Sequence, residues 1–228
     1  MLSLFFQARF AAFRPFTTGS FRATAGYVTP SAAYGLILNL AGIEMRNDDG
    51  KSEMTLIAKT LPRLRLALGA LVEPSRHSIL QQLHNYPIGK SNEEHAPRTM
   101  GSKYNIVPVR REFLSELKGY ICLEAEPALE KEIISGLQGR GRSRYGLPFL
   151  GDNNFLLDRL EPVEACQPAW WWVPVKDDGE DCSDKITRLT LSIDRSNSSL
   201  TRSALFSPTP TKLSTPPQIA WVDLPLSS

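Results

Sequence analysis

The order of strand-like and helix-like segments in the first 160 residues constrains the fold most strongly. Residues 2–12 alternate apolar and other side chains, which is typical of a half-buried strand, and residues 62–73 repeat this alternation. Between these two segments, Thr29 and Pro30 are favourable N-cap and first-turn residues for a helix, which Gly42 is placed to end. The first part of the chain therefore predicts a strand, a helix and a second strand.

A similar order follows further along the chain. Residues 119–126 predict a third strand, residues 127–137 a short helix that starts at a proline, and residues 153–159 a fourth strand. Strand, helix, strand, strand, helix, strand is the ferredoxin-like order, which many RNA-binding domains use. We therefore predict an α+β, ferredoxin-like (RRM-like) domain over residues 1–160.

Two regions depart from this pattern. Residues 74–112 are a long polar stretch, and structureless connections of this length are uncommon in compact domains, so we expect a functional excursion there. The chain after residue 160 contains a run of three tryptophans at 170–172, a β-like segment at 186–194 and a tail rich in Pro, Ser and Thr. We expect a small β-rich appendage over residues 161–228.

Local arginine clusters are more informative than the bulk charge. A formal net charge of +2 does not by itself indicate a nucleic-acid-binding protein. The loop at 139–146 contains Arg140, Arg142, Arg144 and Tyr145 among glycines. Glycines let a backbone approach phosphates, arginines add positive charge, and a tyrosine can stack on a base. We predict RNA or phosphate contact here rather than a Walker loop, because no Gly-Lys-Ser/Thr follows.

Other basic residues lie near the first loop and the excursion. Arg14 and Arg22 bracket the loop after the first strand. The basic residues in or beside the excursion are Arg76, Arg98, Lys103, Arg110 and Arg111. If the excursion folds as a hairpin, it forms a basic arm that can reach across RNA. A solvated charged loop explains the same pattern equally well.

The three histidines are the candidates for metal-independent RNA cleavage. Such cleavage needs a base near the 2′-hydroxyl and an acid near the leaving oxygen. His77, His84 and His95 lie in the polar stretch, outside any recognisable motif, so no base and its orienting partner can be named. We therefore predict no catalytic residue. Their spacing also fits no zinc pattern, and we expect neither a metal nor a cofactor.

The cysteines and the apolar segments indicate the cellular compartment of the protein. Cys122, Cys166 and Cys182 are widely spaced and odd in number, which fits neither a disulfide framework nor a zinc site. Reduced thiols in a cytoplasm agree best with this pattern. No apolar run is long enough to cross a bilayer, and the apolar N-terminal segment lacks the features of a signal peptide. We expect a cytoplasmic protein without a membrane partner.

Two ordered motifs resemble the Cas-five family, the RAMP-superfamily subunits of type I CRISPR Cascade complexes. The first joins Phe-Arg-Pro-Phe at 13–16 to Thr-Pro-Ser-Ala-Ala-Tyr-Gly-Leu at 29–36, which includes Tyr34. The second, at 144–154, resembles the glycine-rich segment of the family and the strand after it. The resemblance covers roughly residues 1–160 and is greatest to type I-B members. It adds Tyr34 to the RNA-binding candidates.

The resemblance implies a non-catalytic subunit that caps the 5′ handle of the guide crRNA. Its expected partners are the crRNA handle, the Cascade backbone subunit and the large subunit, with target DNA reached indirectly through guide base pairing. The excursion, at about 76–111, then corresponds to the thumb of the family. Two alternatives stay open: an endoribonuclease that processes precursor crRNA without metal, which is the activity of one subgroup, and a general RNA-binding module unrelated to CRISPR.

Overall fold

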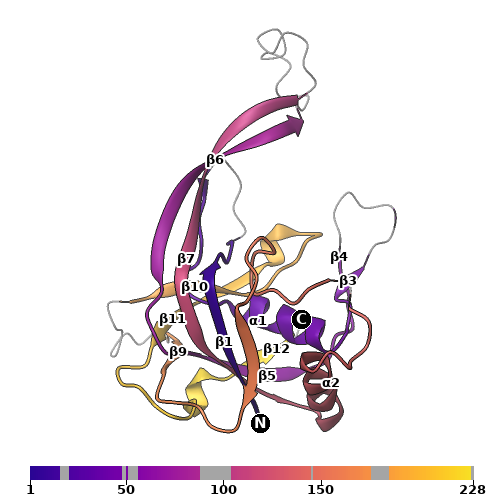
Figure 1. Ribbon diagram of the computed structural model, residues 1–228, viewed down its shortest axis with the longest axis vertical. Helices are drawn as coiled ribbons and strands as arrows, with labels where there is room; N and C mark the ends of the chain where they lie inside the picture. Colours follow the sequence, from indigo (N-terminus) through magenta and orange to yellow (C-terminus); the bar gives the residue numbers. More distant parts are fainter. Residues whose placement is uncertain are drawn as a thin grey trace.

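The computed structural model of the chain is a mixed α+β protein built on one large sheet (Figure 1). It describes residues 1–15, 21–47, 50, 56–87, 104–144, 146–175 and 185–226. Within these residues the sheet has ten strands, and its pairings are antiparallel apart from the short strand β2 (Phe21–Arg22), which runs parallel to β7. A separate pair consists of β3 (Arg46–Asn47) and β4 (Leu56–Ile57).

Four strands and two helices form the centre of the molecule. The strands β5 (Leu64–Ala70), β7 (Tyr104–Ala125), β1 (Leu2–Ala11) and β8 (Arg159–Val163) are neighbours in that order, each antiparallel to the next. The helices are α1 (Pro30–Leu40), between β1 and β5, and α2 (Pro127–Leu137), between β7 and β8. The strands and helices therefore follow the chain order expected from the sequence.

Helix α1 begins where its capping residues predict. The Thr29 hydroxyl accepts a hydrogen bond from the Ala32 amide at 3.2 Å, and Pro30 occupies the first turn, where its missing N–H leaves no donor unpaired. The chain leaves the helix at Gly42, whose φ of 70° favours glycine. Local chemistry thus fixes both ends of this helix.

The expected fourth strand at 153–159 is wrong in position. Most of that segment forms turns, and β8 begins only at Arg159. The carboxylate of Asp152 accepts the Asn154 amide at 3.0 Å, and its carbonyl accepts the Phe155 amide at 3.1 Å. These local bonds favour a turn over a strand.

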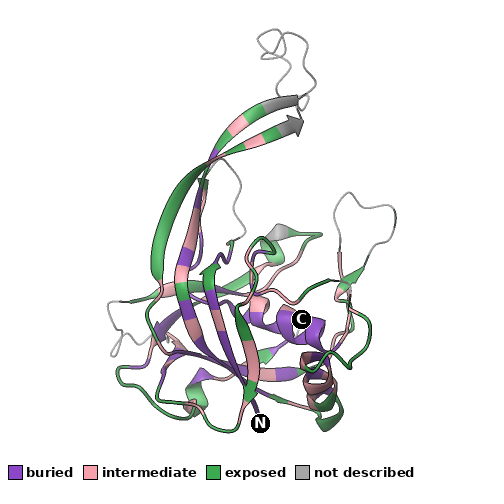
Figure 2. Ribbon diagram, in the orientation of Figure 1, coloured by how far each residue is buried: buried purple, intermediate pink, exposed green. Residues whose placement is uncertain are grey.

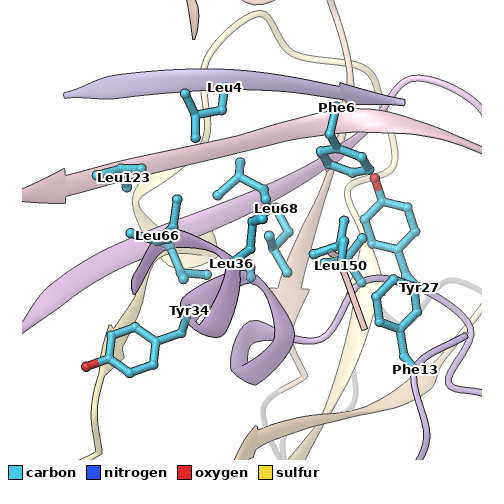
Figure 3. Close-up of a cluster of buried hydrophobic side chains, with 14 of the residues drawn as sticks. Leu4, Phe6, Phe13, Tyr27, Tyr34, Leu36, Leu66, Leu68, Leu123 and Leu150 are labelled. Carbon is cyan, nitrogen blue, oxygen red and sulfur yellow. The ribbon is translucent and has the colours of Figure 1, made fainter. Parts of the chain in front are cut away.

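The main core lies between the sheet and the helices. Its buried side chains come from β1, β5, β7 and α1, and include Leu4, Phe6, Leu66, Leu68, Leu123 and Leu36 (Figure 3). Tyr27 is also fully buried, stacks on Trp172 with 5.2 Å between ring centroids, and donates a hydrogen bond to the Gly69 carbonyl. Burial raises the pKa of the Tyr27 hydroxyl far above its ordinary value.

A second core covers the opposite face of the sheet. Trp171 of β9 (Trp170–Pro174) packs there against Phe5, Tyr120 and Cys122. A Cβ at Gly69 would lie 2.9 Å from the Trp171 ring, so this close packing requires glycine. Trp172 joins the helix-side core instead, and the tryptophan run therefore serves both faces, as strand geometry requires.

The C-terminal strands continue the central sheet. Strand β9 pairs with β5 and with β11 (Arg202–Pro208), which pairs in turn with β10 (Thr187–Ser192). Strand β12 (Val222–Leu224) also pairs with β5, and two short 3₁₀ turns lie at Ser198–Leu200 and Gln218–Ala220. The expected boundary at residue 160 falls inside β8. The division into two parts stays a prediction.

The polar excursion contains a long β-hairpin that extends away from the body (Figure 1). Strand β6 (Ser75–Pro87) pairs antiparallel with the first part of β7, from Ser75 opposite Ser115 to Pro87 opposite Tyr104. We call residues 75–87 with 104–115 the arm. Most of its described side chains are exposed or half-buried (Figure 2). In the part of the chain that the structure describes, no helix has the length and apolarity to cross a membrane.

Candidate nucleic-acid interface

The junction of arm and body contains a buried carboxylate shared by two arginines. Asp152 Oδ2 lies 2.5 Å from Arg14 Nη2 and 2.6 Å from Arg111 Nη2. The loop that carries Asp152 docks on the end of β1, where the Asp152 amide donates to the Ala12 carbonyl at 2.9 Å. Gly151 permits this approach, because its φ is 88° and a Cβ there would meet the Ala12 oxygen at 2.5 Å.

The two arginines have different environments. The Arg111 side chain is only 8% exposed, and its Nε has no hydrogen-bond partner among the described residues. The RNA contact expected at Arg111 stays a prediction, and burial argues against it, because the guanidinium is enclosed between Asp152 and the Phe155 ring. Arg14 is 41% exposed. Two guanidinium groups on one carboxylate leave a net positive charge, and Arg14 presents it to solvent.

Beside this carboxylate lies a group of four rings, which we call the aromatic cluster: Phe10, His77, Phe113 and Phe155. They come from β1, β6, β7 and the turn after Asp152. Phe113 is central, with ring centroids 5.6 Å from Phe10, 5.3 Å from His77 and 6.2 Å from Phe155. His77 stacks on Phe113 with 26° between the planes, and its Nε2 shares a 2.7 Å hydrogen bond with Ser115.

The aromatic cluster is open to solvent. Phe10 is 47% exposed, His77 is exposed, and Phe113 and Phe155 are half-buried. The sequence alternation places Phe10 on the core face with Ala8, which is wrong. The register passes from Ala8–Leu117 to Phe10–Ser115, and Glu116 between them has a φ of 60°. The register is unchanged, but the buried positions pass from Ala8 to Ala11 on β1 and from Leu117 to Leu114 on β7, so Phe10 lies outside the core.

Sequence reasoning missed the three phenylalanines as candidate contacts. Two of them lie beside arginines in the sequence, Phe10 after Arg9 and Phe113 two residues after Arg111. That neighbourhood of rings and guanidinium groups was the available signal. Nothing in the sequence alone brings Phe155 to the same place, because its position depends on the turn at Asp152.

The other face of the arm carries a second ion pair at its base. Arg76 Nη1 lies 3.7 Å from Glu112 Oε2, and the same carboxylate oxygen accepts the Thr24 amide at 3.1 Å. Arg76 and Arg110 are exposed, and Arg22 is half-buried on β2, beside β7. Arg76, Arg110 and Arg22 therefore all lie at or near the base of the arm. Arg98 and Lys103 fall outside the described residues.

The glycine- and arginine-rich loop lies at the end of α2. Arg142 forms a 2.7 Å ion pair with Glu132 of α2, and Arg140 donates to Gln138. Arg140 and Arg142 are exposed, Arg144 is half-buried, and Tyr145 lies outside the described residues. Among the described residues, no ion pair or ring contact joins this loop to the aromatic cluster.

Tyr34 is a core residue. Its side chain is buried on α1, and its hydroxyl donates to the Pro62 carbonyl at 2.7 Å (Figure 3). Burial raises the pKa of this hydroxyl. The RNA contact expected at Tyr34 stays a prediction, and burial argues against it, because helix packing encloses the ring.

Histidines and cysteines provide two further kinds of candidate site. His77 and His84 are exposed on β6, and His95 lies outside the described residues. Within the described ranges, no group of three or more His, Cys, Asp or Glu side chains could hold a metal ion. Away from the arm, the sulfurs of Cys122 and Cys166 lie 3.7 Å apart, and Cys182 lies outside the described residues.

The thiol pair has opposite pKa shifts. A hydrogen bond from the Cys122 thiol lowers the pKa of Cys166 to about 7, although partial burial opposes the shift. The same bond, with burial, raises the pKa of Cys122. Cys166 is the half-buried member of the pair and Cys122 is buried, so a thiolate forms first at Cys166.

Comparison with known proteins gives structural likeness only. No protein-family model matches the chain, and neither does any curated protein. A chain of a "CRISPR RNA-guided surveillance complex" is similar in fold, with a TM-score of 0.55 and 13% identity over 96% of this chain and 95% of that one. The two chains therefore share an α+β fold.

Two further solved structures are less similar. One is described as a Cas protein, with a TM-score of 0.43 and 15% identity over 94% of each chain. The other is a CRISPR protein from Archaeoglobus fulgidus, with a TM-score of 0.37 and 12% identity over 98% of this chain and 91% of that one.

Proposed function

We propose that this chain is a non-catalytic RNA-binding subunit of a type I CRISPR Cascade complex, most like the Cas-five subunit of type I-B systems. In this proposal a ferredoxin-like body caps the 5′ handle of the guide crRNA, and the arm acts as a thumb against the RNA. The backbone subunit and the large subunit are the protein partners, and target DNA is reached through the complex. The role is RNA-guided DNA targeting in antiviral defence.

One observation carries the proposal. A hairpin arm projects from the body, and its base holds exposed cations and exposed rings. Positive charge attracts the phosphate backbone, and aromatic rings stack on unpaired bases. The fold shared with a chain of an RNA-guided complex supports the same interpretation. The two sequence motifs that resemble the Cas-five family point in the same direction.

A guide-processing endoribonuclease is the second candidate, and His77 is the observation that favours it. This histidine is exposed at the base of the arm, within hydrogen-bond distance of Ser115. Its ring is stacked on Phe113, however, and the Ser115 hydroxyl that it meets is neither an acid nor a base near neutral pH. We propose that the His77 side chain supports RNA binding rather than proton transfer.

The test uses the CRISPR repeat of the genome that encodes the chain. The purified chain is titrated with RNA of the 5′ handle and with a scrambled RNA of equal length, and intact RNA is followed on a denaturing gel. We expect preference for the handle and no cleavage, with or without divalent metal. Equal affinity for both RNAs would contradict handle recognition. Single-site cleavage that disappears in His77→Ala would establish the endoribonuclease instead.

A further inference from the structure

The aromatic cluster is unusual because its rings touch one another yet remain open to water. Four rings from separate segments converge within 6.4 Å, centroid to centroid, around Phe113 and Phe155. An isolated exposed phenylalanine is ordinary on a protein surface, whereas a contiguous apolar patch marks an interaction site. The cluster therefore has the character of a surface that a ligand covers.

The chemistry around the rings favours a nucleotide over an apolar protein side chain. The guanidinium carbon of Arg111 lies 5.0 Å from the Phe155 ring centroid, and Arg14 shares the Asp152 carboxylate with Arg111. One carboxylate cannot neutralise two guanidinium groups, so positive charge remains next to the rings. Exposed aromatic rings beside excess positive charge are complementary to a base and its phosphate.

The geometry also indicates how a flat ring is held. The His77 imidazole already stacks on Phe113 at 5.3 Å with 26° between the planes. Phe10 meets Phe113 edge-on, at 77°, and is 47% exposed. The two more exposed members, Phe10 and His77, both contact Phe113. Phe10 and His77 therefore present exposed ring surface to a planar ligand.

We infer that the aromatic cluster binds one unpaired nucleobase of single-stranded RNA by stacking, while the Arg14 guanidinium contacts a flanking phosphate. The base must be unpaired, because neighbouring pairs cover both faces of a base in a duplex. This inference rests on the proposed function, since RNA has to reach the base of the arm. It gives a role in base binding to the residues of the aromatic cluster, which no sequence motif identifies.

The experiment locates that base with a fluorescent analogue. A 2-aminopurine is placed at each position of the handle RNA in turn, because stacking quenches its fluorescence. With the wild-type chain we expect one position to be strongly quenched on binding. The double variant Phe10→Leu/Phe113→Leu should abolish this quenching and lower RNA affinity about tenfold or more, because leucine cannot replace base–aromatic stacking.

A matched substitution controls for general effects. Phe21 of β2 is 49% exposed, close to the value of Phe10, and lies outside the aromatic cluster. Phe21→Leu should leave both the quenching and the affinity unchanged. Arg14→Gln should keep the quenching but reduce the slope of log affinity against log salt by about 0.7, because glutamine carries no charge to neutralise the phosphate. Thermal unfolding of each variant verifies that the fold is retained.

The outcomes separate this inference from the proposed function. If the wild-type chain binds handle RNA and the double variant binds equally well with the same quenching, only the inference fails. If the wild-type chain does not bind handle RNA, both fail. If the double variant binds RNA normally but does not enter the assembled complex, the cluster contacts a protein, which also overturns the inference.

Discussion

Strand β7 passes through two regions that stabilise and use it differently. From 117 to 125 it lies in the body between β1 and β5, where Leu117, Ile121 and Leu123 are fully buried. From 104 to 115 it belongs to the arm, where most described side chains are exposed or half-buried (Figure 2). One continuous strand therefore contributes to the core at one end and to a surface at the other.

The difference indicates what holds the arm in place. A two-stranded hairpin alone is marginally stable in water, because it buries little apolar surface. The arm contacts the body at its base through strand pairing with β1 and β2, through the buried Leu114, and through polar groups such as Arg111 with Asp152 and Glu112 with the Thr24 amide. We infer that the body fixes the direction of the arm through these contacts, which leaves most of the arm surface available to ligands.

The largest expected effect on stability distinguishes a body leucine from an arm leucine. Leu66 is fully buried in β5, whereas Leu80 in β6 is 74% exposed. Leu66→Ala should lower the free energy of unfolding by about 4 kcal/mol, since it removes buried methyl groups and leaves a cavity. The same change at Leu80 should cost less than about 0.5 kcal/mol. Urea unfolding followed by circular dichroism measures both, and similar losses would show that the arm is part of the core.

The next effect tests the polar junction itself. Asp152→Asn should lower the free energy of unfolding by about 3 kcal/mol, because it leaves the buried Arg111 guanidinium without a compensating charge. Arg9, which pairs with the exposed Asp158 at 3.5 Å, is the surface comparison. Arg9→Gln should cost at most about 1 kcal/mol. An Asp152→Asn chain as stable as the wild type would mean that the junction does not fix the arm.

The sequence predicted the parts of the body that depend on local chemistry. Thr29 and Pro30 mark the start of α1, and alternation identifies β1 and β5, because caps and periodicity are properties of neighbouring residues. The start of β8 was misplaced because the side chain of Asp152 stabilises a turn that competes with a strand. Propensity alone does not decide between these two outcomes.

The candidate site was less predictable because it forms between distant segments. Arg111 is buried only because Asp152, 41 residues away in the sequence, lies against it. Phe10 lies outside the core at the point where the alternation of buried residues breaks on both β1 and β7, next to the positive φ of Glu116 in the partner strand. Sequence periodicity within one strand contains no information about either event. The basic and aromatic composition was visible in the sequence, but its assembly at the junction was not.

Shortening the arm should have a small effect on the fold and a large effect on RNA binding. Gln82 and Pro108 face each other in the hairpin, so residues 83–107 can be replaced by a two-residue Asn-Gly turn. The free energy of unfolding should change by less than about 1 kcal/mol, because the described side chains that are removed are exposed or half-buried and loop closure costs change slowly with length. Assembly of the full complex on guide RNA should be impaired. Normal assembly and normal target binding by the shortened chain would contradict the proposal that the arm acts as a thumb.

A smaller stability effect is expected at the loop that the sequence singled out. Arg140, Arg142 and Arg144 changed together to Ala should alter stability by less than about 1 kcal/mol, because the pair of Arg142 with Glu132 is exposed. RNA affinity should fall, and the salt slope should decrease by about 0.7 for each arginine that neutralises a phosphate in the wild-type chain. Binding and slope equal to those of the wild-type chain would confine RNA recognition to the arm and its base.

The smallest effect concerns a thiol and leaves the fold unchanged. Cys122 lies in the body part of β7 and is buried, whereas Cys166 is half-buried and has its pKa lowered to about 7 by the Cys122 thiol. A thiolate reacts with iodoacetamide and a thiol does not, so modification of Cys166 should increase as the pH rises through about 7. An ordinary cysteine reaches the same rate only near pH 8.5. Peptide mass spectrometry of the briefly treated, folded chain identifies the modified residue.

In Cys122→Ser, a hydroxyl replaces the thiol, and the pH midpoint for Cys166 should change because its hydrogen-bond partner is different. Faster labelling of Cys122 than of Cys166 would show that the body opens as readily as its surface, which contradicts the contrast between the two parts of β7.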